Sequence, residues 1–508
     1  MKIHNPYSKV RISKDILPKE LLIYILVWSS AVFYAITCFA NESNKYFQYY
    51  DDAYSDFTQG WSFLNRKKDV ADFEWQSMKF LIKNLCLWVV LLSVVSEVLR
   101  KYSFIRILQL WQIVVTVLFI INNLGVIALL VILLQPVIFS FVLTKHSKLM
   151  IWLCNGIVLV LISMYKNFIA KEEFFIIFKL KEQAAYITII TIFWMNLRCV
   201  SYGLDLIDSK GKQDFVAFLS YCLYLPNALT GPFISYKDFV TSHKHSNNLF
   251  SRLSQLFLDV SRFLFWLFFT ELCLHFIYVN ATGFHPEWVE SLDSWSLYGY
   301  GYTMGQFFHI KYLVIYGLAT SFAKFENIKV PSLPVCIGRI HLYSDMWKYF
   351  DAGLYNFLLR YIYIPTMKNR FITSRSLSSL FCFLFVYVWH GTDNYILIWT
   401  LLNYIGVIIE NCSHWFNTKY LQNSKLYESL GPKWFRRINC MTASPLLAMS
   451  AISNFYFFAR IEIGNIFFSR FMNDNSWSNF VLLTILYNCC QVSTEVRRKQ
   501  RNSKDKNA

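Results

Sequence analysis

The stretch LLIYILVWSSAVFYAITCFA, residues 21–40, has no charged side chain and is long enough to cross the hydrocarbon core of a bilayer as one helix. It is longer than the apolar core of a cleaved signal peptide, which favours a retained first span over a removed leader. Lysine and arginine recur through residues 1–20, and cationic flanks favour the cytosolic side of a membrane. We therefore expect a basic cytosolic N-terminus over residues 1–20, followed by a membrane domain.

The composition of the whole chain indicates that lipid is its solvent. Of the 508 residues, 55% are hydrophobic and only 16% are charged, against about 25% charged in soluble proteins. The mean hydropathy is +0.35. This composition excludes intrinsic disorder, collagen and coiled coil, and it argues against the set of soluble domains that the length alone would suggest.

Further apolar segments recur along the chain, at residues 80–99, 105–121, 126–143, 150–164, 184–204, 215–225, 256–279, 297–322, 377–388, 395–409, 446–458 and 480–490. Several have the length of a membrane span, whereas 215–225 and 377–388 are too short to cross alone and suggest re-entrant or half-helices inside a bundle. The sequence therefore predicts an all-α, polytopic integral membrane protein with about ten transmembrane helices. We expect one membrane domain over residues 21–490 and a cytosolic basic tail over residues 491–508.

The charge balance is strongly basic, with 49 lysine and arginine residues against 32 acidic residues and a net charge of +17. Basic residues between apolar segments are typical of positive-inside topology and of attraction to anionic head groups. No nucleic-acid-binding motif is present, so nucleic acid is not an expected partner. A basic surface also suits a polyanionic cofactor such as coenzyme A. The twelve cysteines form no CxxC pair and no zinc spacing, which predicts packing residues.

His390 is the first candidate for chemistry, because ionisable groups inside apolar sequence are costly and mark functional sites. It ends the run FVYVWHG, residues 385–391, where Gly391 allows close approach of a backbone or ligand. A neutral imidazole in a water-filled cavity acts as a general base near neutral pH. The alternative is a packed histidine that donates to a backbone carbonyl. Trp389 beside it would wall the cavity or serve as an ordinary interfacial tryptophan.

Asp351 is the second candidate, within a helix that we expect over residues 345–364. Apolar side chains recur there at the 3–4 spacing of one buried stripe, and Asp351 lies beside that stripe. The carboxylate needs a partner, and a salt bridge with Lys348 is the structural alternative to a catalytic role. The helix is expected to end before Pro365, as helices often do.

Three stretches carry a resemblance to a known family: KKDVADFEW at residues 67–75, YLPNALTGP at 224–232 and WKYFDAGLYNFLLRYIYIP at 347–365. Together with WHG at residues 389–391, they look like the membrane-bound O-acyltransferase superfamily and, more closely, the Hedgehog acyltransferases. The similarity runs from the first span to near the end of the chain. The WHG triplet alone is a weak signal, whereas the block around Asp351 and the stretch ending at Trp75 are specific.

The resemblance implies a palmitoyltransferase in the membrane of the endoplasmic reticulum, or of the Golgi. Such proteins move palmitate from palmitoyl-coenzyme A to the amino group of an N-terminal cysteine on a secreted Hedgehog-type signalling protein, or on other secreted ligands that begin with cysteine. The resemblance gives His390 the position of the catalytic histidine and Asp351 that of the essential aspartate. The catalytic core is then expected over about residues 215–460.

Further site residues are expected from the resemblance and from charge. Cys336 matches the cysteine that binds haem b in the vertebrate form, and a thiolate is a suitable axial ligand for iron. Asn454 matches a position that contacts the acyl donor, and Trp347 and Trp389 are expected beside it. The phosphates of coenzyme A are expected to meet a cationic cluster, for which the alternative is a topology signal: Lys348, Arg360, Lys368, Arg370 and Arg375.

Two departures from the family pattern concern the donor contacts. Thr230 replaces a different polar residue, and Lys348 replaces an arginine, which removes a bidentate donor. Two other function classes stay open from the residues alone. One is an acyltransferase of the same superfamily that acts on a lipid or a serine hydroxyl, against which the stretch at residues 72–75 argues. The other is a transporter or non-catalytic membrane scaffold.

Overall fold

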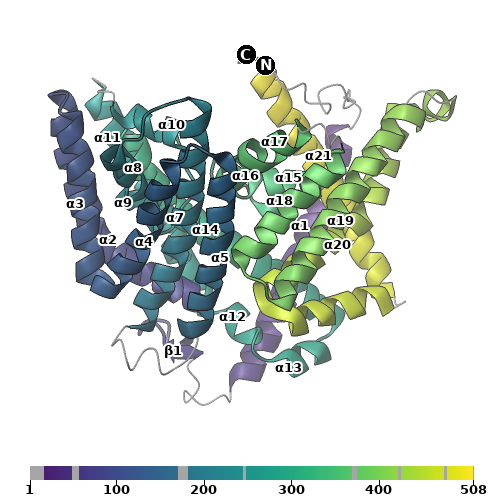
Figure 1. The fold of residues 1–508 in the computed structure, drawn as a ribbon. Coiled ribbons are helices and arrows are strands. Elements are labelled where there is room, and N and C mark those ends of the chain that lie inside the picture. The colour runs from purple at the N-terminus through teal and green to yellow at the C-terminus, as the bar shows by residue number, and fades with distance from the viewer. Residues whose placement is uncertain are drawn as a thin grey trace.

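Helices account for nearly every described element of the computed structural model (Figure 1). The structure describes residues 17–48, 56–169, 181–243, 248–368, 374–421, 425–473 and 477–506. The elements in chain order are α1 (Pro18–Gln48), β1 (Phe57–Gln59), β2 (Lys67–Asp69), α2 (Phe73–Lys101), α3 (Ile105–Asn123), α4 (Val126–Leu143), α5 (Lys148–Ile169), α7 (Glu182–Asp208), α8 (Phe215–Cys222), α9 (Leu225–Ala228), α10 (Tyr236–Phe239), η2 (Val240–His243), α11 (Leu249–Cys273), α12 (Val279–Thr282), α13 (Pro286–Ser291), α14 (Ser294–Phe325), η3 (Ile337–Arg339), α15 (Tyr343–Tyr349), α16 (Ala352–Leu358), η4 (Leu359–Tyr363), α17 (Ile364–Met367), α18 (Arg375–His390), α19 (Asn394–Phe416), η5 (Asn417–Leu421), α20 (Lys425–Asn473) and α21 (Trp477–Lys506).

The expectation of a helical, polytopic membrane protein is confirmed. Within the described residues, eight helices are long and apolar enough to cross a membrane: α1, α2, α3, α4, α5, α7, α19 and α20. The helices α11, α14 and α21 are also long, at 25, 32 and 30 residues. Residues 215–225 hold the eight-residue α8, a short helix buried in the bundle as expected.

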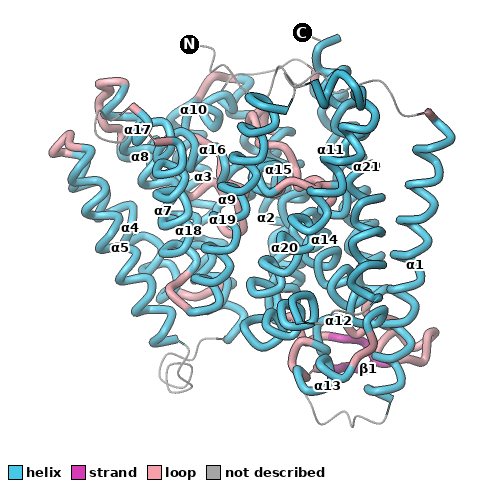
Figure 2. Tube along the Cα trace, turned by 90° about the vertical axis from the view of Figure 1, so that its right-hand side faces the viewer, coloured by secondary structure: helices cyan, strands magenta, loops and turns pink. Residues whose placement is uncertain are grey.

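A small cap lies at the end of the bundle opposite to the end of α21 (Figures 1 and 2). It consists of the antiparallel β1–β2 hairpin together with α12 and α13. Asp69 joins the hairpin to α12, because its carboxylate accepts the backbone N–H groups of Asn280 at 2.7 Å and Ala281 at 3.2 Å. Burial raises the pKa of Asp69 to about 7. The hairpin is therefore held to α12, which lies more than two hundred residues later in the chain.

The long helix α14 passes through the bundle between α1 and α11. Gly299 permits close packing with α1, because a Cβ at this position would overlap the backbone carbonyl of Ala35. A second long helix, α20, is bent rather than straight. Ala459 and Arg460 depart from helical geometry, with φ of +66° at Arg460. The bend reorients the end of α20 after its run of phenylalanines.

The single helix expected over residues 345–364 is wrong. The segment is broken into α15 and α16, and Asp351 stands between them as the residue that caps α16. Its side chain accepts the N–H of Leu354 at 2.8 Å, which ends one helix and starts the next. The helical structure also does not end before Pro365. This proline lies in the first turn of α17, where a missing N–H costs little. The apolar stripe correctly predicted helical structure in this segment, but it did not reveal that Asp351 begins a new helix.

Candidate active site

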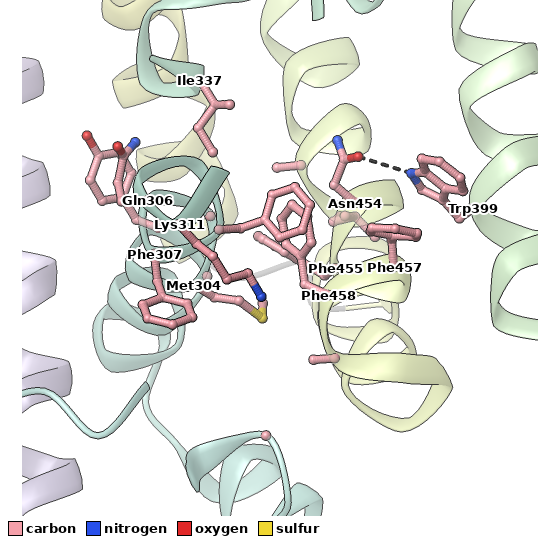
Figure 3. A pocket seen from close by; sticks show the side chains of 18 of the residues that line it. Met304, Gln306, Phe307, Lys311, Ile337, Trp399, Asn454, Phe455, Phe457 and Phe458 are labelled. Carbon is pink, nitrogen blue, oxygen red and sulfur yellow. Dashed lines mark hydrogen bonds between the residues drawn. The ribbon is translucent and has the colours of Figure 1, made fainter. Parts of the chain in front are cut away.

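One cavity of about 1200 Å³ lies inside the bundle and contains both predicted chemical residues, His390 and Asp351, in its wall. Its lining extends from Asp72 and Asn280 near the cap to Trp347 of α15. Figure 3 shows the part between α14 and α20, where Met304 and Lys311 of α14 reach toward Phe455 and Phe458 of α20. The structure therefore brings Asp351 and His390, which are some forty positions apart in the sequence, to the wall of one cavity.

His390 is the last residue of α18 and borders the cavity. Its Nδ1 lies 3.0 Å from the carbonyl oxygen of Val386, an atom that can only accept, so Nδ1 carries the proton. The lone pair of the neutral ring is then on Nε2. The backbone contact that was the alternative to a catalytic role is present, and it fixes the tautomer that a general base requires. Trp399 and Phe457 pack on the ring at centroid distances of 5.3 and 5.5 Å.

The backbone after His390 turns away through Gly391, which has φ of +116°, a conformation that favours glycine. Trp389 walls the cavity as expected, and its indole donates to the carbonyl of Phe193 at 3.2 Å. Its ring also packs on Trp194 of α7 with a centroid distance of 5.7 Å. Contacts with α7 thus hold Trp389, the residue directly before His390.

Asp351 lines the same cavity from the junction of α15 and α16. Besides capping α16, it accepts a hydrogen bond from the hydroxyl of Tyr316 on α14, at 2.8 Å. The predicted alternative partner, Lys348, instead has its ammonium 5.2 Å from the ring centre of Tyr349. The carboxylate is therefore held by two neutral donors, in the wall of the cavity that His390 also lines.

Trp347 and Asn454, both predicted at the acyl donor, also line the cavity. The indole of Trp347 donates to Asn403 of α19 at 3.1 Å. Asn454 of α20 accepts from the indole of Trp399 at 3.1 Å, the bond drawn in Figure 3. These bonds place two amides and two indoles on the wall next to His390. Such groups fix the orientation of a ligand in an otherwise apolar cavity.

The predicted cationic cluster is not assembled at the cavity. Neither Lys348 nor Arg360 is among its lining residues. Arg360 pairs with Asp205 of α7 at 2.8 Å and lies over the ring of Tyr361, so it has a structural role. Arg370 lies outside the described residues. The expected contacts of Lys348 and Arg360 with phosphates remain predictions.

Cys336 lies half-buried in the segment between α14 and η3. Its thiol is 3.7 Å from the side-chain oxygen of Gln306, which lines the cavity. The next two residues, Ile337 and Gly338, line it as well. Among the residues that the structure describes, no three histidine, cysteine or acidic side chains are grouped to hold a metal ion.

Lys311 was not predicted and is the most buried charge in the cavity wall, with 4% of its surface exposed. Its ammonium bridges Asp72 at 2.8 Å and Glu74 at 2.7 Å, so the three groups carry a net charge of −1. Tyr312 donates to Glu74 at 2.9 Å. A lysine inside the apolar run 297–322 was a visible signal, since such charges in lipid need a partner or a function. The acidic partners come from the stretch ending at Trp75.

Comparisons with known proteins agree with this geometry. The model of the membrane-bound O-acyltransferase family matches residues 177–452. Protein-cysteine N-palmitoyltransferase Rasp of Drosophila melanogaster is 35% identical over 60% of this chain and 61% of its own length, which is less than two thirds. Protein-cysteine N-palmitoyltransferase HHAT of Mus musculus is 26% identical over 83% of this chain and 87% of its own. The mouse HHAT-like protein is 23% identical over 69% and 70%.

The family model covers more than half of the chain, and the region it matches includes α7, α14, Asp351 and His390. The chain belongs to the membrane-bound O-acyltransferase family.

Proposed function

We propose that the protein transfers palmitate from palmitoyl-coenzyme A to the α-amino group of an N-terminal cysteine on a secreted Hedgehog-type signalling protein. The observation that carries the proposal is the shared cavity of His390 and Asp351. Two relatives along most of the membrane domain are named protein-cysteine N-palmitoyltransferases, which supports this reaction over others of the family. The membrane of the endoplasmic reticulum is the proposed location, with the acceptor on the lumenal side.

The chemistry begins with the acceptor amine, which has an ordinary pKa of about 7.7–8.0 and is mostly protonated at neutral pH. The ammonium proton is lost to solvent, and His390 takes one of the two remaining protons on the nitrogen through Nε2, directly or through a water molecule. The amine nitrogen then attacks the thioester carbonyl carbon, the carbon–sulfur bond breaks and an amide forms. The proton on His390 goes to the leaving sulfur of coenzyme A. Asp351 supports the positive charge that develops on the imidazole and on the nitrogen.

The cavity suits both substrates of this reaction. Its apolar lining can hold an acyl chain, since each buried CH₂ group contributes about 0.8 kcal/mol. Near the cap, the net negative charge of Asp72, Glu74 and Lys311 favours a cationic amine. The protein would thus hold the thioester and the amine at one depth in the membrane, next to His390.

An acyl-transfer assay tests the proposed function. Purified protein in detergent is given labelled palmitoyl-coenzyme A and a peptide that begins with cysteine. We expect label in the peptide as an amide that survives hydroxylamine, and no transfer to the same peptide with an acetylated N-terminus. Equal labelling of both peptides, or transfer only to lipid or to a serine hydroxyl, would instead support the other acyltransferase reading. Solute movement without thioester consumption would support a transporter.

We propose that the sulfur of Cys336 would hold haem b. Its donor chemistry fits, because a half-buried thiol borders residues of the cavity wall and thiolates bind haem iron. When bound, haem would supply an iron–sulfur bond that fastens the segment before η3, and acyl transfer does not run through it. We expect a Soret absorption band in the purified protein that is lost in Cys336→Ala and kept in Cys86→Ala, a variant of an exposed cysteine. An unchanged band in Cys336→Ala excludes this cysteine as the ligand.

A further inference from the structure

Glu410 is a buried carboxylate in a membrane-spanning helix that the proposed reaction does not use. It lies on α19 with 8% of its surface exposed. A charge at such a position is costly unless its hydrogen bonds are strong, so a carboxylate there indicates a specific task. The apolar segment at residues 395–409 ends directly before it.

Both oxygens of Glu410 accept hydrogen bonds from one residue, Ser344 of α15. Oε2 accepts the backbone N–H at 3.1 Å, and Oε1 accepts the hydroxyl. The first N–H groups of a helix have no partner within it. The residue before α15, Leu342, has no side chain that could cap them. A carboxylate from another helix therefore supplies the cap that the local sequence lacks.

The contact between α19 and α15 extends over two turns of α19. Asn403 lies seven residues before Glu410, on the same face, and accepts the indole N–H of Trp347 at 3.1 Å. Gly406 lies between them, where a Cβ would overlap the ring of Tyr343. Three successive positions on one face of α19 thus hold three side chains of α15. The register between the two helices is set by a cap, a close approach and a polar bond.

The register of α15 determines where Asp351 lies. The helix ends at Tyr349, and only Phe350 separates it from the aspartate. A shift or loosening of α15 therefore moves Asp351 relative to His390, which is on a different helix. We propose that Glu410 is a positioning residue that holds Asp351 in its place in the wall of the cavity, acting through Ser344 and α15. This inference rests on the proposed function only where it predicts a change in the rate of catalysis.

The first test is Glu410→Ala, which removes both acceptor oxygens. We expect kcat to fall about tenfold or more, as displacement of a catalytic group by less than an ångström does, while the KM for the cysteine peptide changes less than about twofold. Glu410→Gln keeps an oxygen that can accept from Ser344, and kcat should recover to within about threefold of the wild type. A wild-type kcat in Glu410→Ala, or no recovery in Glu410→Gln, overturns the inference.

A double mutant distinguishes loss of the contact between Glu410 and Ser344 from general destabilisation of the protein. Ser344→Ala should lower kcat by itself, and adding it to Glu410→Ala should change nothing further, because Glu410→Ala already removes the acceptor of the Ser344 hydroxyl. Additive losses would contradict the inference. Asp259→Asn is the matched control, since Asp259 on α11 is equally buried, with 7% exposed, but lies away from α15 and does not line the cavity. A fall in kcat with this control as large as with Glu410→Ala overturns the positioning role.

Hydrogen exchange gives a readout that does not depend on activity. In Glu410→Ala, the amides of residues 343–358 should exchange at least about tenfold faster, whereas Asp259→Asn should leave them unchanged. Unchanged exchange over this segment overturns the inference whether or not the protein is an acyltransferase. Absence of transfer by the wild type, with faster exchange in Glu410→Ala, would instead reject the proposed function and retain the coupling of Glu410 to α15.

Discussion

Replacement of His390 by alanine is expected to abolish palmitoyl transfer while the protein still inserts and folds. A general base contributes about 10²- to 10⁴-fold to a reaction rate. His390 is the imidazole whose Nδ1 is held by Val386, which leaves Nε2 for the amine in the cavity. The loss should appear in kcat, because the side chain acts on the proton and contributes little to holding the acyl chain.

The measurement is single-turnover transfer of labelled palmitate to the cysteine peptide, with size-exclusion profile and thermal unfolding as checks of folding. His146→Ala is the control, since His146 is exposed in the connection between α4 and α5. It should match the wild type in every assay. Full transfer by a well-folded His390→Ala protein would exclude His390 as the base. Partial rescue by added imidazole would strengthen the assignment.

Replacement of Asp351 by asparagine should lower kcat by about 10²-fold with little change in stability. The amide oxygen can still accept the N–H of Leu354 and cap α16, but the negative charge is gone. Loss of one electrostatic contact to a developing charge in a dry site has an effect of this size. Asp351→Ala should show the same catalytic loss and, in addition, about 1 kcal/mol less stability from the missing cap.

The comparison of these two variants separates catalysis from structure. Thermal unfolding should rank the wild type and Asp351→Asn together, above Asp351→Ala, while kcat should rank both variants far below the wild type. A turnover of Asp351→Asn close to that of the wild type would show that the carboxylate serves α16 alone. Matched losses of kcat and stability in both variants would lead to the same conclusion.

The sequence predicted the parts of the fold that depend on hydrophobic length. Residues 21–40 became a span within α1, and 215–225 became the short α8, because the number of apolar residues decides whether a helix can cross lipid. His390 and Asp351 were found because an ionisable group in apolar sequence is uncommon. These inferences needed no knowledge of which helices meet.

The features that the sequence did not predict share a different cause. Each involves a partner side chain far away in the sequence. The break at Asp351 comes with a bond from Tyr316, thirty-five residues earlier, besides the local cap on Leu354, and periodicity reports neither bond. Arg360 was expected at a phosphate site, which stays a prediction, and the sequence did not show its partner Asp205 on α7. Lys311 and Glu410 were visible in the sequence as charges at apolar segments, but their partners, Asp72 with Glu74 and Ser344, lie far away along the chain.

The packing of α1 sets an order for biogenesis. Its close contact at Ala35 is with Gly299 of α14, and Glu20 near its start pairs with Arg437 of α20. Both partners are synthesised hundreds of residues after α1 has entered the bilayer, so the first helix cannot dock while the ribosome is translating the early spans. Nascent chains stalled before residue 294 that carry Ala35→Cys would therefore react with a lipid-soluble thiol reagent, whereas in the finished chain this position is buried against α14.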